Sequence, residues 1–174
     1  MIFKGLKRNA YKKSIESYIK KRTPQARQVR SIKSLAVLID ASQSVNILSV
    51  VKLANELGVK SDSLKVMGYK EDQKEISDDK DAAYYNNKSF GVNAAIRSNS
   101  LQEFINKEYD VLINFYSESK LELDIVAAAS KAKFKVGFSE IDNRINDLVI
   151  GSANDNTNLF ISELKKYFKI LQII

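Results

Sequence analysis

An unbroken apolar run of strand length, SLAVLID at residues 34–40, is the feature that most constrains the fold of this chain. A strand that is apolar throughout is typical of a parallel sheet with both faces covered. The spacing of apolar residues in SQSVNILSVVKLANELG at 42–58 predicts a helix, and SLKVMGY at 63–69 has the composition of a second strand. The succession of strand, helix and strand predicts a right-handed βαβ unit.

The same alternation continues along the chain. Strands are predicted at 109–116, 134–139 and 147–151, and residues 70–98 are expected to hold a charged loop with either an edge strand or an irregular excursion. A C-terminal helix is indicated by apolar residues that recur every three or four positions, at Phe160, Leu164, Tyr167, Phe168, Leu171 and Ile174. We therefore expect a single three-layer, Rossmann-like α/β domain at 34–174, with a mostly parallel sheet of four to five strands.

Polar residues indicate where the predicted helices begin and end. Ser42 or Ser44 is expected to cap the first helix of the domain, and Gly58 suits the position just past its end. The Ser-x-x-Glu sequences at 100–103 and 119–122 have the spacing of capping boxes, so two further helices are predicted to begin there.

The chain has no Cys and no His among its 174 residues. Disulfides and thiolate metal sites are therefore excluded, and the most common general acid/base and metal ligand is missing. A Ser-His-Asp triad is excluded for the same reason. These absences favour a non-enzymatic protein, and the sequence predicts neither a metal ion nor a cofactor.

The carboxyl ends of the predicted strands are where an open α/β sheet binds ligands. The turn after the first strand, DASQSVN, contains no Gly, so neither a dinucleotide fingerprint nor a phosphate-binding loop can be read there. Asp40 is interpreted either as a ligand of a ribose or metal or, more simply, as the cap of its own turn. A small ligand or nucleotide sugar at this edge would be surrounded by Asp40, Ser42, Ser117, Glu118, Ser139 and Glu140.

Charge is distributed unevenly along the chain. Of the 28 Lys and Arg residues, 11 lie in the first 34 residues, where Glu16 is the only acid. The other 140 residues contain 17 basic and 20 acidic side chains, so a strongly basic segment precedes a mildly acidic domain. Such an asymmetry is typical of a protein with a polyanionic partner.

Residues 1–33 are expected to form a basic helix and a linker around Pro24, which ends the helix. Apolar residues recur at helical spacing in the second half of this helix, at Tyr11, Ile15, Tyr18 and Ile19. Ile2, Phe3 and Leu6 lie on a different face, so either the first turns pack separately or the helix buries two faces.

Three interpretations of the basic helix stay open. It docks on the domain through its tyrosines, or it binds RNA or an RNA-containing assembly such as the ribosome, or it associates with an anionic membrane surface. The excess of basic charge favours RNA. The residues predicted to contact phosphates are Lys4, Lys7, Arg8, Lys12, Lys13, Lys20, Lys21, Arg22, Arg27 and Arg30.

The sequence contains no sign of a membrane span or a leader. No apolar run approaches the roughly 20 residues that cross a bilayer. The basic N-terminus is not followed by the apolar region of a signal peptide. A cytoplasmic location is therefore expected.

Two family resemblances centre on DVLINFYSESKLELDIVAAASKAKFKVGFSE at 110–140. The chain as a whole resembles a small uncharacterised bacterial domain family with a basic first helix, a strand like SLAVLID, AKFKVGF-type and DLVI-type strands and a final helix. That family has no assigned activity, so the resemblance implies no catalytic residues. The strand–helix–strand that ends in KVGF is similar to part of the N-terminal domain of heptosyltransferase-like glycosyltransferases. The second, sugar-nucleotide-binding domain of those enzymes is missing, which implies a non-catalytic relative.

Overall fold

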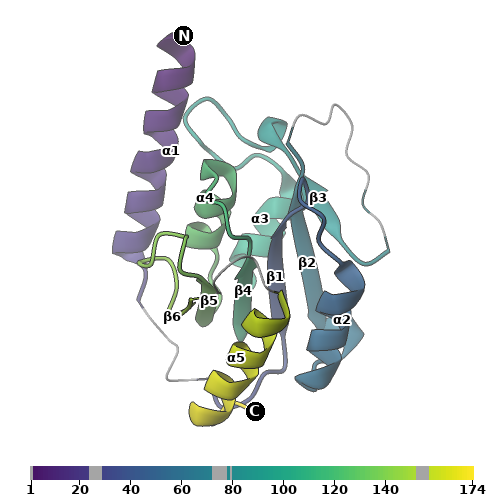
Figure 1. Cartoon of the computed structure of the whole chain (residues 1–174). Coiled ribbons are helices and arrows are strands. Elements are labelled where there is room, and N and C mark those ends of the chain that lie inside the picture. The colour runs from purple at the N-terminus through teal and green to yellow at the C-terminus, as the bar shows by residue number, and fades with distance from the viewer. Residues whose placement is uncertain (1, 24–28, 72–77, 79, 152–156) are drawn as a thin grey trace.

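A computed structural model of the chain describes residues 2–23, 29–71, 78, 80–151 and 157–174 (Figure 1). The helices are α1 (Ile2–Lys21), α2 (Ile47–Glu56), α3 (Asn99–Asn106), α4 (Leu121–Ala129) and α5 (Thr157–Ile170), with short 3-10 turns η2 (Ser61–Ser63) and η3 (Asn87–Ser89). The strands are β1 (Leu35–Asp40), β2 (Leu64–Tyr69), β3 (Ala83–Tyr85), β4 (Val111–Phe115), β5 (Phe134–Phe138) and β6 (Leu148–Ile150). Strands and helices alternate, as the sequence predicts.

The six strands form one parallel sheet in the order β3-β2-β1-β4-β5-β6. The α/β class and the parallel sheet are thereby confirmed, but the predicted number of four to five strands is wrong. β3 is the strand that the sequence left open. It has only three residues and follows a charged segment, so neither its length nor an apolar run marks it. Short strands are common at sheet edges, where β3 and β6 lie.

Helices cover both faces of the sheet (Figure 1). On one face, Val50 and Leu53 of α2 and Ile161 of α5 line a small cavity together with Val37 and Ile113 of the two central strands. α4 covers the other face with α3 beside it, and α1 packs along α4. β1 is buried at every position, which is the environment that its uninterrupted apolar sequence predicts.

The two ends of α2 show one wrong and one confirmed prediction. Asn46 caps the helix instead of Ser42 or Ser44, because its side-chain oxygen accepts the backbone N–H of Leu48 at 3.0 Å. Gly58 follows the helix with a φ of 76°, in the left-handed region that glycine adopts without strain.

The predicted starts of α3 and α4 are wrong by one or two residues. Ser98 caps α3 through the backbone N–H of Leu101, and Ser100 lies inside the helix. α4 begins after Lys120, which makes no side-chain capping bond. The hydroxyl of Ser119 donates instead to the carboxylate of Asp124, an ionisable acceptor that competes with the capping role.

The apolar face of α5 packs on the sheet over most of the predicted length. Its fully buried members are Phe160, Leu164 and Phe168. The extension of this face to Leu171 and Ile174 is wrong, because both side chains are exposed. The helix ends before them and Gln172 adopts a φ of 58°, so the chain turns and buries Ile173 in their place.

Candidate functional site

α1 is one continuous helix that lies against the domain (Figure 1). Tyr11 and Ile15 are buried in the same core as the sheet. The Tyr11 ring packs on Phe90 with 5.4 Å between ring centroids, and burial raises the pKa of Tyr11 well above its usual value. The first turns project past the domain and leave Ile2 and Leu6 79% and 59% exposed. The helix is therefore docked through its middle and its second half.

Most basic side chains that were predicted to bind RNA are exposed. The exposed group consists of Lys4, Arg8, Lys12, Lys13, Lys20, Lys21 and Arg30. Lys7 is partly buried, with its Nζ 5.4 Å from the centroid of the Tyr11 ring. Arg22 is bonded inside the molecule, and Arg27 lies outside the described residues.

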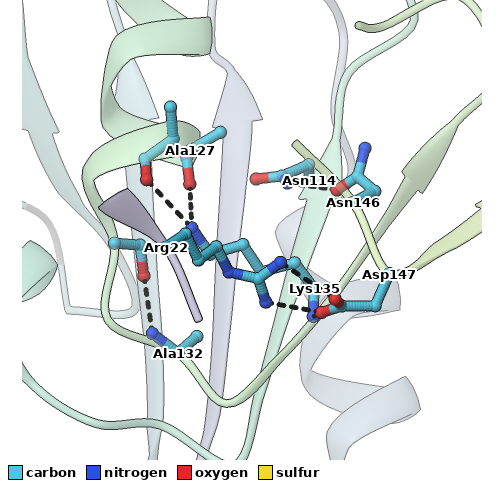
Figure 2. A network of polar contacts seen from close by, with 9 residues as sticks. Arg22, Asn114, Ala127, Ala132, Lys135, Asn146 and Asp147 are labelled. Atoms are coloured by element: carbon cyan, nitrogen blue, oxygen red, sulfur yellow. Dashed lines mark hydrogen bonds and ion pairs between the residues drawn. The ribbon is translucent and has the colours of Figure 1, made fainter. Parts of the chain in front are cut away.

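Arg22 is held by Asp147, the residue before β6 (Figure 2). Its Nη1 and Nη2 atoms donate to the two carboxylate oxygens of Asp147 at 2.9 and 2.6 Å. The same carboxylate accepts the backbone N–H of Lys135 at 2.8 Å. This bidentate pair ties the end of α1 to β5 and β6, so Arg22 can contact a phosphate only if the pair breaks.

Lys135 lies in the middle of β5 and is fully buried. Its Nζ donates to the backbone oxygens of Ala127 and Ala128 at 2.7 and 3.1 Å, at the C-terminal end of α4 (Figure 2). Burial lowers the pKa of Lys135 to about 7, and the neighbouring Arg22 acts in the same direction. Sequence reasoning missed this residue, although a lysine inside an otherwise apolar strand is a signal that marks the position.

Glu16, the only acid of the basic segment, is paired with a cation of the domain. Arg144 Nη2 lies 2.6 Å from Glu16 Oε1 and 2.6 Å from Asp142 Oδ2. The hydrogen bond from Arg144 lowers the pKa of Glu16. The three side chains together carry one net negative charge, against six exposed cations on α1, so the surface of α1 stays strongly positive.

A groove of about 370 Å³ lies beside the C-terminal end of α1. Tyr18 and Lys21 line it from α1, and Lys131 and Ala132 line it from the segment after α4. Glu108 is the acidic residue of its described lining. Tyr18 is 37% exposed, so the groove combines an accessible aromatic side chain with two lysines.

Asp40, at the carboxyl end of β1, is fully buried and bonded on several sides. It accepts the backbone N–H of Ser42 at 3.0 Å and also the hydroxyl of that residue. Lys120 Nζ lies 2.8 Å from Asp40 Oδ2 and 3.1 Å from Glu71 Oε2. Burial opposes the charge on Lys120, but its bonds to the two carboxylates prevail and raise its pKa. Asp40 thus caps its own turn and holds the start of α4.

The remaining residues predicted at the carboxyl edge are not brought together. Ser117 lines a pocket there, whereas Glu118, Ser139 and Glu140 are exposed and are absent from the described lining of that pocket. Gln43 lines the same pocket and was not predicted. Its position in the loop after the first strand of an open α/β sheet was the signal that could have identified it.

Comparison with known proteins gives one match, to a family model that includes most of α1 as well as the sheet. No curated protein and no solved structure matched the chain. A family model described as a family of unknown function (DUF6913) matches residues 7–171. This match confirms the resemblance to an uncharacterised domain family, whereas the similarity to heptosyltransferase-like enzymes stays a prediction. The chain therefore belongs to DUF6913, a family of unknown function.

Proposed function

We propose that this protein binds RNA, or an assembly that contains RNA, through the exposed surface of α1. One observation carries the proposal: α1 packs on the domain and yet exposes basic side chains along its length. These exposed side chains are Lys4, Arg8, Lys12, Lys13, Lys20 and Lys21. From Lys4 to Lys20 this group extends over about 24 Å of helix. Lysine and arginine side chains that replace the counterions of a nucleic acid strand supply most of the affinity in such an interface.

The docking of α1 supports this role. Tyr11 and Ile15 hold the middle of the helix, and the Arg22–Asp147 pair holds its end. The backbone of α1 is therefore ordered before an RNA strand arrives. Binding then restricts lysine side chains but does not have to order the helix, which reduces the entropic cost of association.

The groove beside Tyr18 favours single-stranded RNA over a duplex. Bases of a single strand can leave the stack and lie on an aromatic ring, whereas the bases of an A-form duplex are stacked inside it. Lys21 and Lys131 line the same groove, where they would contact the phosphates next to that base.

The salt dependence of RNA affinity tests the proposal on the full-length chain. Removal of α1 is unsuitable, because it would expose the core that Tyr11 and Ile15 cover. The test variant carries Lys12→Gln, Lys13→Gln and Lys20→Gln. The control loses the same charge on other exposed parts of the molecule through Lys60→Gln, Lys65→Gln and Lys169→Gln.

The measurement is fluorescence anisotropy of labelled oligouridine at increasing salt. Each lost phosphate contact lowers the slope of log K against log salt by about 0.7 for a single strand, so the test variant should lose about two from the slope. The control should keep the slope of the natural protein. An affinity that does not depend on salt, or an equal loss in both variants, contradicts the proposal.

The exposure of Ile2 and Leu6 favours a second candidate function, association with an anionic membrane. Both project from the first turns of α1 beside Lys4 and Arg8, and apolar and basic residues together suit a lipid interface. Among the described helices, none is long and apolar enough to cross a bilayer. Flotation that requires phosphatidylserine in the vesicles, and that is lost on Ile2→Ser with Leu6→Ser, would favour this function over RNA binding.

A further inference from the structure

The pocket that Ser117 lines has a volume of about 440 Å³. It lies beyond the carboxyl ends of the central strands, where the strand order reverses between β1 and β4. Ligands of open α/β sheets bind in the crevice at this reversal. The volume is within the range of small-molecule sites.

Uncharged polar side chains dominate the described lining of the pocket. They come from the loop after β1, the segment after β4 and the first residues of α5: Gln43, Ser44, Asn46, Ser117, Thr157 and Asn158. In the part of the lining that the structure describes, no side chain is charged. Hydroxyl and amide groups donate and accept hydrogen bonds, so this rim suits a ligand with hydroxyl groups and ring nitrogens.

Aromatic side chains form the apolar part of the pocket. Phe115 is partly exposed, and its ring centroid lies 5.6 Å from that of Phe138. Phe138 is itself stacked on Phe160, with 4.2 Å between centroids. This packing holds the Phe115 ring in place, so a planar ring of a ligand can stack on a surface that is already formed.

The loop between β1 and α2 is fixed by its own hydrogen bonds. The N–H of Gln43 donates to the backbone oxygen of Asp40 at 3.1 Å, and the N–H of Val45 donates to that of Gln43 at 2.8 Å. The loop contains no Gly that would let the backbone approach a phosphate closely. Lys120, the cation next to α4, is bound by Asp40 and Glu71.

At the start of α2, two backbone N–H groups that could bind a phosphate are already bonded to Asn46. The N–H of Leu48 donates to the side-chain oxygen of Asn46 at 3.0 Å, and the N–H of Ser49 donates to the backbone oxygen of Asn46 at 3.0 Å. A phosphate in this pocket would lose hydration without gaining a cationic partner among the described lining residues.

We propose that this pocket binds a free nucleoside, with its base stacked on Phe115 and its ribose hydroxyls bonded by the polar rim. The described lining carries no charged side chain, and it therefore selects the nucleoside over the corresponding nucleotide or nucleotide sugar. The site is formed by α2, α5 and the carboxyl edge of the sheet, so it is independent of RNA binding by α1.

Saturation-transfer NMR on the full-length protein tests this proposal. The probes are adenosine, guanosine, cytidine and uridine, each compared with its 5′-monophosphate. At least one nucleoside should receive saturation from the protein, and its monophosphate should bind at least about tenfold more weakly, the factor that corresponds to 1.4 kcal/mol. The absence of a signal from all four nucleosides, or tighter binding of the monophosphates, overturns the proposal.

Two variants locate the signal in the pocket. Ser117→Phe and Ser44→Phe each place a large ring in the pocket. Ser117 is partly exposed and Ser44 is exposed, so both variants should fold, which thermal unfolding checks. Ser139→Phe is the matched control, because Ser139 follows β5 at the same edge but is absent from the described lining. Both pocket variants should lose nucleoside binding and keep RNA affinity. Unchanged nucleoside binding in both contradicts the assigned site.

Discussion

Lys12 on α1 and Lys135 on β5 belong to neighbouring parts of the molecule, and one is exposed whereas the other is fully buried. Lys12 keeps its hydration and is accessible to a phosphate. Lys135 has lost its hydration, its Nζ is bonded to the end of α4, and its pKa has fallen to about 7. The difference separates two roles for basic residues here, because some face outward as candidate contacts while Lys135 and Arg22 anchor the structure.

Substitution of Lys135 should have the largest effect, on the pH dependence of stability. Between about pH 7 and pH 10.5 the folded chain has lost the proton of this amine and the unfolded chain keeps it. The unfolded state then binds more protons, so the free energy of unfolding rises with pH. Below pH 7 both states are protonated and the contribution of Lys135 is constant. Lys135→Met should remove this rise, which amounts to several kcal/mol.

Urea unfolding across that pH range measures the effect. Lys65→Met is the control, because Lys65 is an exposed lysine on β2 and should leave the pH profile unchanged. If the free energy of unfolding of Lys135→Met depends on pH as that of the natural protein does, the pKa of Lys135 in the folded chain is not lowered.

Substitution of Asp147 should have the next largest effect, on the attachment of α1. Asp147→Asn removes the charge that pairs with Arg22 and leaves a partly buried guanidinium without its carboxylate. Loss of one partner of such a pair should lower the free energy of unfolding by about 3 kcal/mol. Urea unfolding at neutral pH measures this, with exposed Glu140→Gln as the control. A loss below about 1 kcal/mol would place the Arg22–Asp147 pair among ordinary surface pairs.

Substitution of Glu16 should have the smallest effect on stability. Its carboxylate is exposed and Arg144 keeps Asp142 as a partner, so Glu16→Gln should leave the urea midpoint unchanged. Removal of this negative charge should strengthen oligouridine binding slightly in the anisotropy measurement. A marked loss of stability would instead show that the Glu16–Arg144 pair anchors α1 as the Arg22–Asp147 pair does.

Interactions between residues close in sequence were the most predictable. Asp40 caps its own turn through Ser42, two residues away, and Gly58 ends α2 with a positive φ. Helix starts were less predictable, because several polar residues stand within a few positions of each start. Ser100 has the spacing of a capping box, yet Ser98 is the residue whose hydroxyl meets a free N–H.

The candidate site was predicted only where it depends on residues close in sequence. The exposed lysines of α1 follow from the local concentration of charge, since charged side chains remain in water unless they find a partner. That Arg22 is paired inside the molecule, unlike the exposed lysines, could not be predicted, because its partner Asp147 is 125 residues away in sequence. The pocket at the carboxyl edge likewise combines side chains from four separate segments.

The order of apolar runs and helices by itself determined the α/β class, because a strand with two apolar faces is stable only when helices cover both of them. The charge asymmetry was also a property of the sequence alone. The tertiary structure decided which cations are available and which are bonded inside, and it shifted the pKa of Lys135. Burial and ion pairing depend on which surfaces meet, and residues such as Arg22 and Asp147 meet only when α1 packs beside the sheet.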